Sequence, residues 1–118
     1  MKTLIFDEIF NQPLDRGVLP DSLTQLTFDG KYNQPIVKGV LPKSLKVLTF
    51  GFGFNQPLAQ GVLPDSLEEL TFGYNFDQCL GENVLPDSLT VLKTWFELDD
   101  DSVIPVGCVH TLTYVFGS

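Results

Sequence analysis

The sequence is poor in the residues that most often carry catalytic and metal-binding chemistry. It has one histidine, two cysteines, one methionine and one tryptophan among its 118 residues. Two cysteines cannot build a disulfide scaffold, and Cys79 and Cys108 lie too far apart in sequence for a zinc knuckle. We therefore expect a reduced, intracellular chain, and its length is that of a single domain covering residues 1–118.

Positive charge and long apolar runs are also scarce. Lys and Arg total 7 against 15 Asp and Glu, which gives a formal net charge of −8. A chain of this sign is repelled by nucleic-acid phosphates and by anionic lipids, so we expect neither nucleic acid nor membrane as a partner. Asp7 interrupts the apolar start of the sequence, and the apolar stretch at 103–109 is too short to span a bilayer. These features predict a soluble, cytoplasmic protein.

Repetition is what the sequence has in abundance. The Leu-Pro pair at position 19 recurs at positions 41, 63 and 85, always at the same interval of twenty-two. The unit is Leu-Pro-x-Ser-Leu-x-x-Leu-x-Phe, then Gly-x-x-Phe-Asn-Gln-Pro-Leu, then x-x-Gly-Val. Regular copies extend to about residue 94, and a degenerate copy or cap follows at 95–118. In that last copy we align 111–115 with 88–92, which lengthens the interval by one position.

Twenty-two residues cannot enclose a hydrophobic core alone, so the copies must stack on one another. The Leu-x-Phe alternation predicts one very short strand per copy, with both apolar residues facing inward. The sequence therefore predicts a β-rich solenoid of about five coils whose strands form a parallel sheet. We also expect positive φ at a recurring turn position, because Asn replaces Gly there: Gly17, Gly39, Gly61 and Asn83.

Two polar columns keep the interval of the repeat. The first follows an aromatic residue in each copy and comprises Asn11, Asn33, Asn55 and Asp77. A buried amide must be hydrogen-bonded, so we predict a ladder that links the backbones of neighbouring coils. The second column has smaller side chains, is expected to play the same part, and comprises Ser22, Ser44, Ser66 and Ser88. Both columns are expected to be structural rather than catalytic.

The Leu-x-x-Leu-x-Phe segment followed by Asn resembles a leucine-rich repeat. More narrowly, Phe54-Asn55-Gln56-Pro57 together with Leu-Pro-x-Ser-Leu resembles the FNIP repeat, a leucine-rich subclass of this repeat length found in social amoebae and giant viruses of protists. The resemblance implies a leucine-rich-repeat solenoid with a parallel sheet on its concave face and irregular or 3-10 segments on its convex face. It also implies a role in protein–protein recognition.

The strand positions that alternate with the inward Leu and Phe are expected to face solvent on the concave sheet. We predict that they bind a protein partner: Gln25, Thr27, Val47, Thr49, Glu69, Thr71, Val91, Lys93, Tyr114 and Phe116. The threonines among them also suit a pleated surface without any binding role. Exposed apolar residues are expected to gather toward the C-terminal end, where Trp95, Phe96, Tyr114 and Phe116 form either an interface or a terminal cap.

No enzyme, cofactor or metal site is expected. Cys108 and His110 would share one side of a strand, but nothing in the sequence supplies the orienting group of a Cys-His nucleophile. The acidic run at 99–101 lacks the alternating ligand spacing of a calcium loop. The predicted function is a non-enzymatic protein-interaction module. The alternative is a self-assembling structural protein, a homodimer through a terminal strand or the C-terminal apolar patch.

Overall fold

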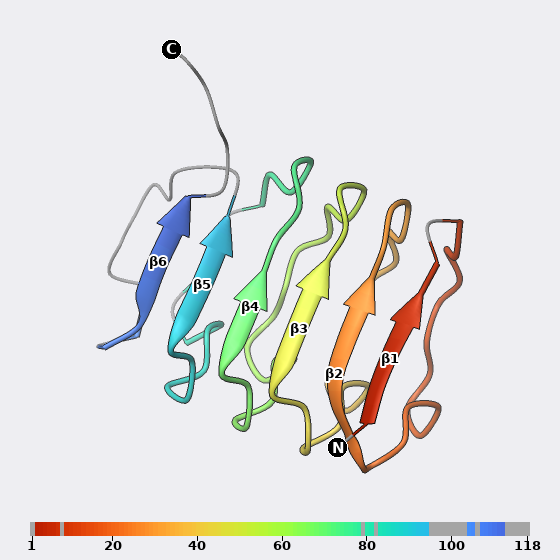
Figure 1. Ribbon diagram of the computed structural model, residues 1–118, viewed down its shortest axis with the longest axis horizontal. Coiled ribbons are helices and arrows are strands. Elements are labelled where there is room, and N and C mark those ends of the chain that lie inside the picture. Colours follow the sequence, from red (N-terminus) through yellow and green to blue (C-terminus); the bar gives the residue numbers. More distant parts are fainter. Residues whose placement is uncertain are drawn as a thin grey trace.

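The computed structural model describes residues 2–7, 9–78, 80–81, 83–94, 104–105 and 107–112. These residues contain six strands, β1 (Lys2–Phe6), β2 (Leu23–Phe28), β3 (Val47–Phe50), β4 (Glu69–Thr71), β5 (Val91–Thr94) and β6 (Val109–Leu112). All neighbouring strands are parallel and follow one another in chain order across a single sheet (Figure 1). The predicted solenoid with a parallel sheet is thereby confirmed.

The return from each strand to the next is irregular. Turns and extended segments occupy it, and the residues that the structure describes include no 3-10 helix. Of the two forms expected for the convex side, the described part of the chain therefore shows the irregular one. Within the described ranges there is likewise no helix with the length and apolar character needed to cross a membrane.

The strands pair in the register that the repeat dictates. Gln25 of β2 lies beside Val47 of β3, which lies beside Glu69 of β4, so each partner is one full repeat further along the chain. Strand side chains alternate between two faces, and this register turns the Leu and Phe columns inward together. Leu26, Leu48 and Leu70 are fully buried as a result. The core is therefore a set of columns that run from coil to coil beneath the sheet.

Two columns of aromatic rings stack through the length of this core. One stands at the ends of the strands and the other just before the asparagine column: Phe6, Phe28, Phe50 and Phe72, and Phe10, Tyr32, Phe54 and Phe76. Within a coil, the two ring centroids are 3.9–4.2 Å apart. Between coils they are 5.3–6.3 Å apart. The rings are near-parallel, which adds stacking attraction to their burial.

The turn after β3 and β4 brings the backbones of neighbouring coils into close approach. A Cβ at Gly51 would stand 2.3 Å from the Gly30 nitrogen, and one at Gly73 would stand 2.1 Å from the Gly51 oxygen. Backbone hydrogen bonds hold the same turns together, from Gly53 N–H to the Gly30 carbonyl at 2.9 Å and from Asn75 N–H to the Phe52 carbonyl at 3.0 Å. Glycine is required here because a side chain would have no space.

A second turn uses left-handed backbone, as the sequence predicts. The φ angles are 85° at Gly17, 95° at Gly39, 86° at Gly61 and 61° at Asn83. In the second coil the space left by glycine is filled by the preceding coil. The Arg16 guanidinium lies over Gly39, and its Nε donates a hydrogen bond to the Lys38 carbonyl at 3.0 Å.

The last coil departs from the predicted register. Val109 of β6 pairs with Val91, an interval of eighteen positions, so the alignment of 111–115 with 88–92 is wrong. The inward Leu is replaced in β6, and the inward Phe is already replaced at the end of β5. His110 takes the place across from Leu92, and its Nε2 is hydrogen-bonded at 2.8 Å to the hydroxyl of buried Thr94, which stands where earlier coils have Phe.

We expect Gly51→Ala to lower the free energy of unfolding by about 3 kcal/mol or more, because the added methyl group meets backbone atoms that cannot move aside. Gly81→Ala is the matched control, since its nearest neighbour is a flexible Val84 methyl 3.8 Å away. The control should leave stability unchanged or raise it by up to about 1 kcal/mol. Urea denaturation of both variants measures this, and equal effects would contradict the close approach.

Tyr32→Phe should stabilise the protein. The Tyr32 side chain is 1% exposed, and its hydroxyl has no hydrogen-bond partner among the described residues. Removing a buried, unpaired hydroxyl should raise the free energy of unfolding by about 1–2 kcal/mol. Denaturation of the variant beside the wild type measures the gain, and a loss of stability in Tyr32→Phe would contradict it.

The same substitution should change the response to alkali. Burial raises the pKa of Tyr32 to about 12, whereas an unfolded tyrosine titrates near pH 10. The wild type should therefore keep the full contribution of neutral Tyr32 below pH 10 and lose it between pH 10 and pH 12. The stability advantage of Tyr32→Phe should widen across this interval, which denaturation at a series of pH values would reveal.

Candidate protein-binding face

The asparagine column joins each coil to the one before it. The Asn11 side-chain oxygen accepts a hydrogen bond from Asn33 N–H at 2.9 Å, and the Asn33 oxygen accepts one from Asn55 N–H at 2.9 Å. The Asn55 oxygen accepts from Asp77 N–H at 2.8 Å. The amides are less buried than we expected, because Asn11 and Asp77 are exposed and the inner two are half-buried. The bonds lie near the surface, where the chain bends away from the sheet.

A glutamine column shares these bonds, and the sequence analysis did not assign it a role. Gln34 Nε2 donates to the Asn11 side-chain oxygen at 3.0 Å, and Gln56 Nε2 donates to that of Asn33 at 3.0 Å. Gln78 repeats the pattern with Asn55 at 3.1 Å. Each asparagine oxygen therefore accepts two hydrogen bonds from the following coil. The regular recurrence of Gln next to Asn was the available signal.

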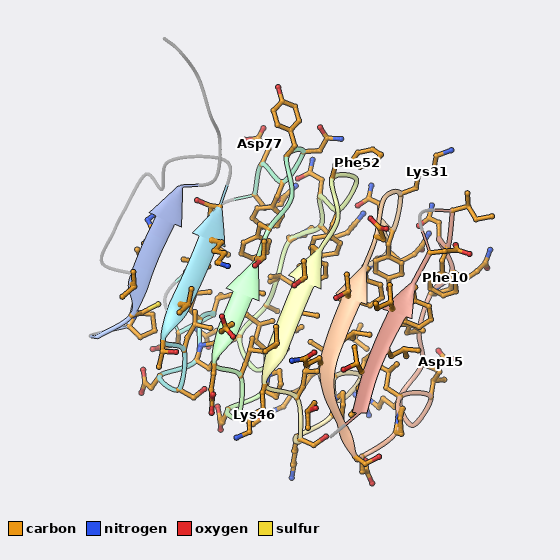
Figure 2. The ribbon with its side chains drawn as sticks, in the orientation of Figure 1. Phe10, Asp15, Lys31, Lys46, Phe52 and Asp77 are labelled. Atoms are coloured by element: carbon orange, nitrogen blue, oxygen red, sulfur yellow. The ribbon has the colours of Figure 1, made fainter. Side chains whose placement is uncertain are left out.

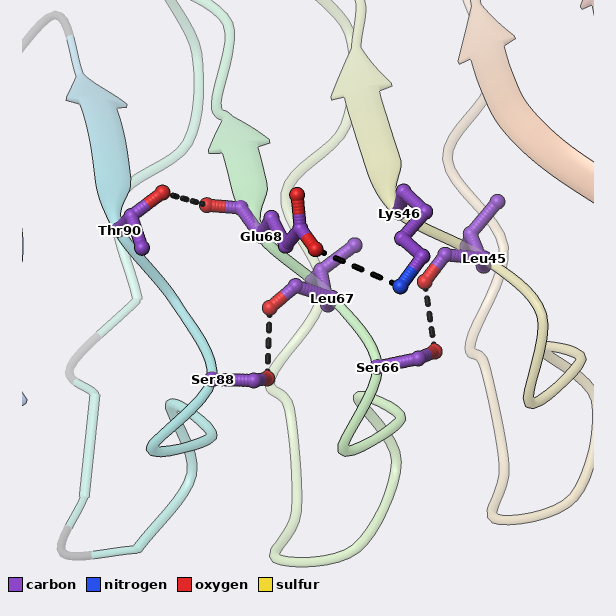
Figure 3. Close-up of polar contacts among 7 residues, drawn as sticks. All are labelled: Leu45, Lys46, Ser66, Leu67, Glu68, Ser88 and Thr90. Carbon is purple, nitrogen blue, oxygen red and sulfur yellow. Dashed lines mark hydrogen bonds and ion pairs between the residues drawn. The ribbon is translucent and has the colours of Figure 1, made fainter.

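The serine column stands at the opposite ends of the strands, where each strand begins (Figure 3). Ser66 Oγ donates to the Leu45 carbonyl at 2.6 Å, and Ser88 Oγ donates to the Leu67 carbonyl at 2.6 Å. Ser44 makes the same contact with Leu23. Ser22 is exposed. Polar side chains at both ends of the strands therefore hold the sheet in register, which fixes the positions of the strand residues between them.

The solvent side of the sheet, here called the sheet face, carries two rows of side chains. One row contains Thr3, Gln25, Val47, Glu69, Val91 and Val109, which are neighbours across the strands. The other row contains Ile5, Thr27, Thr49, Thr71 and Lys93. All of these residues are exposed or half-buried. The structure thus brings together on one surface eight of the ten positions that the sequence assigns to binding.

Charged side chains on the sheet face are few. Glu69 and Lys93 stand in different rows of neighbouring strands. The ion pair between Lys46 and Glu68, with Nζ and Oε2 3.4 Å apart, lies just before the strands and is half exposed (Figure 3). Exposed pairs of this kind contribute little to stability. The face therefore offers mainly hydroxyl, amide and aliphatic groups.

The apolar character of the sheet face differs from expectation. Val47 and Val91 are half-buried rather than exposed, because the flanking strands cover part of each side chain. Ile5 and Val109 are instead the prominent apolar groups, 64% and 60% exposed at the two edge strands. Tyr114, Phe116, Trp95 and Phe96 lie outside the described residues, as does the acidic run at 99–101.

The sequence analysis did not identify two exposed aromatic residues near the sheet. Phe52 and Tyr74 follow β3 and β4 in the turns beyond the strand ends, with 53% and 70% of their surfaces accessible. Figure 2 shows Phe52 at this edge of the sheet, together with Lys31 and Asp77. The equivalent position in the second coil is Gly30, so the column does not look aromatic in the sequence.

Cys108 and His110, the candidate reactive pair, do not form a reactive centre among the described residues. Burial raises the pKa of the Cys108 thiol, which disfavours the thiolate, while His110 is bonded to Thr94. The described ranges contain no cluster of His, Cys, Asp and Glu that could hold a metal ion. A hollow of about 500 Å³ near Lys38, Lys43 and Asp65 is lined by no strand residue and so lies apart from the sheet face.

Truncating the ladder should destabilise the stack. Asn33→Ala removes the acceptor for Asn55 N–H and for the Gln56 amide, and we expect the free energy of unfolding to fall by about 1–3 kcal/mol. Asn75→Ala is the control, because Asn75 is exposed and contributes its backbone N–H to the neighbouring coil. That change should stay within about 0.5 kcal/mol. Chemical denaturation compares the two variants, and equal losses would contradict the ladder.

Comparisons with known proteins agree with this geometry. The family model described as FNIP Repeat matches residues 10–53 and 54–93. Among solved structures, the chain is similar to CroV588, a giant-virus protein described as a novel circular LRR structure, at 46% identity and a TM-score of 0.85. The match covers 91% of this chain and 16% of that one. No curated protein sequence matches. Since the two family matches span more than two thirds of the residues, the chain belongs to the FNIP-repeat family.

Proposed function

We propose that the chain is a non-enzymatic protein-interaction module and that its sheet face binds a protein partner. The observation that carries the proposal is the contrast between the two rows of the sheet face. Over the three coils of β2, β3 and β4, the row through Thr27, Thr49 and Thr71 keeps threonine, whereas the row through Gln25, Val47 and Glu69 has a different residue in each coil.

Residues that recur in every coil do so because the stack needs them. The inward Leu and Phe, the ladder Asn and the turn Gly each have a packing or hydrogen-bonding role that repeats with the backbone. The changing row has no role that repeats in this way, since its members differ in size, polarity and charge; the hydrogen bond from the Thr3 hydroxyl to the Gln25 side-chain oxygen at 3.1 Å joins the first two coils. A surface that is fixed in backbone and variable in side chain is suited to selective recognition.

The net charge of the chain favours a partner that is neutral or basic. The face itself carries Glu69 and Lys93, while the whole chain has a net charge of −8. The long-range field therefore repels acidic partners, and close contact depends on hydroxyl, amide and aliphatic groups. We place this activity in the cytoplasm, where the free thiol of Cys108 would stay reduced.

The relationship to CroV588 supports the architecture rather than a particular partner. This chain spans 16% of that protein, so whatever the complete relative binds is not transferred here. Proteins built from such repeats are commonly interaction scaffolds, which is consistent with the proposal. The partner must therefore be found by experiment.

Affinity capture with matched variants tests the proposal. Val47→Lys places a charge in the variable row of the sheet face, and Val37→Lys makes the same exchange at an exposed residue outside the strands. We expect proteins retained from an extract of the native host to be lost with Val47→Lys and kept with Val37→Lys. Circular dichroism must show both variants folded. Equal retention by wild type and both variants would refute binding through the sheet face.

A further inference from the structure

The hollow of about 500 Å³ lies between two neighbouring coils, apart from the sheet face. Lys38 and Lys43, on the way into β3, line it together with residues 61–66, on the way into β4. Both lysines are exposed. Its buried lining residues are apolar: Leu41, Val62 and Leu63. The hollow therefore combines an apolar floor with two positively charged side chains at its rim.

The Lys38 side chain is laid against the next coil. A Cβ at Gly61, which lines the hollow, would stand 3.3 Å from Lys38 Cδ and 3.7 Å from its Nζ. One coil earlier, Arg16 approaches Gly39 in the same way, but its Nε donates a hydrogen bond to the Lys38 carbonyl at 3.0 Å. The Lys38 ammonium group has no hydrogen bond or ion pair within the described ranges. It is therefore held beside the hollow with its donors unused.

Lys43 is the second unused cation, since it too has no ion-pair partner in the described part of the chain. The other copies have aspartate at its position: Asp21, Asp65 and Asp87. The stack accepts a carboxylate there, so packing does not require a lysine. No other copy has positive charges at the positions of both Lys38 and Lys43. The pair is therefore a local feature of this hollow rather than a property of the repeat.

Positive charge is concentrated here against the sign of the whole chain. The net charge is −8 with 7 Lys and Arg, and three of these, Arg16, Lys38 and Lys43, lie at or beside the hollow. Exposed charges more than about 10 Å apart are largely screened at roughly 0.1 M salt, so the nearest groups decide what the hollow attracts. Apolar walls focus the field of these groups. A small anion is attracted here, although a long polyanion is repelled by the chain.

We propose that this hollow binds a phosphate group, held between the ammonium groups of Lys38 and Lys43. A phosphate monoester carries a charge of about −1.5 to −2 near neutral pH, which matches two lysines better than a single carboxylate does. Each ammonium group offers three donors, and phosphate oxygens accept them as charge-assisted hydrogen bonds. The volume is within the range of small-molecule sites, so the apolar floor has room for the organic part of an ester.

Asp65 determines which side of the hollow the phosphate occupies. Its carboxylate lines the hollow, and no ion pair joins it to Lys38 or Lys43. Because like charges repel, the phosphate lies on the lysine side, away from Asp65. Ser66 is not a donor to the ligand, since its hydroxyl already donates to the Leu45 carbonyl at 2.6 Å (Figure 3).

Amide NMR shifts of the labelled chain, titrated with inorganic phosphate at constant ionic strength, test the site. We expect saturable shifts at Gly39 and Gly61, which line the hollow. Lys38→Gln and Lys43→Gln should each raise the dissociation constant roughly fivefold or more, because each removes one of two attractions. Lys93→Gln is the matched control, since it removes the same charge from an exposed side chain on the sheet face. Shifts that do not saturate, or equal losses in all three variants, overturn the proposal.

A change of opposite sign tests the position of the phosphate. Asp65→Asn should lower the dissociation constant for inorganic phosphate roughly threefold or more, because it removes a like charge from the lining. Asp87→Asn removes the same charge at the equivalent position one coil further on and should have a smaller effect. Unchanged or weaker binding in Asp65→Asn, or an equal gain in Asp87→Asn, contradicts binding in this hollow.

A parallel titration with glycerol 3-phosphate distinguishes the source of the phosphate group. Tighter binding of the ester than of inorganic phosphate supports a ligand whose organic part occupies the apolar floor. Equal or weaker binding of the ester supports free phosphate as the ligand. The site does not depend on the proposed function, because no strand residue lines it. Failure of phosphate binding would therefore leave partner capture by the sheet face untouched.

Discussion

Backbone contact between neighbouring coils is the constraint on which the rest of this molecule depends. At Gly51 and Gly73 the chain passes so close to the preceding coil that a single methyl group has no room. A residue inserted between two such contacts would shift the strand register and expose the inward Leu and Phe side chains to water. The repeat length is therefore kept wherever these contacts occur. It shortens at β6, where His110 stands across from Leu92 of β5 and is hydrogen-bonded to Thr94 at the end of β5.

The hydrogen bonds of the asparagine and serine columns between coils all have one direction. In the asparagine column, the N–H of each coil donates to the side-chain oxygen of the preceding coil. The serine hydroxyls also donate to the preceding coil. In these two columns, the donors of a coil therefore face the preceding coil and its acceptors face the following one. The two columns therefore join neighbouring coils in the same orientation, which agrees with the parallel pairing of their strands.

Much of the fold could be predicted because the physical demands on the repeated positions are strict. Inward strand residues must be apolar, and a left-handed turn accepts Gly or Asn, so the pattern at Gly61 and Asn83 identifies the turn. The exposure of the ladder amides could not be predicted, because it depends on how far the chain bends away from the sheet. The position of β6 was missed because His110 occupies the inward place of a leucine. Phe52 and Tyr74 were missed because a column that contains Gly30 gives no aromatic signal.

The candidate site follows from the same division between fixed and free positions. The threonine row supports the sheet, since β-branched neighbours in register stabilise adjacent strands. The changing row beside it contributes little to that support, so its side chains can vary without loss of the fold. A backbone held this tightly loses little conformational entropy when a partner binds. Selectivity in such a protein therefore arises from side-chain identity along one row rather than from movement of the chain.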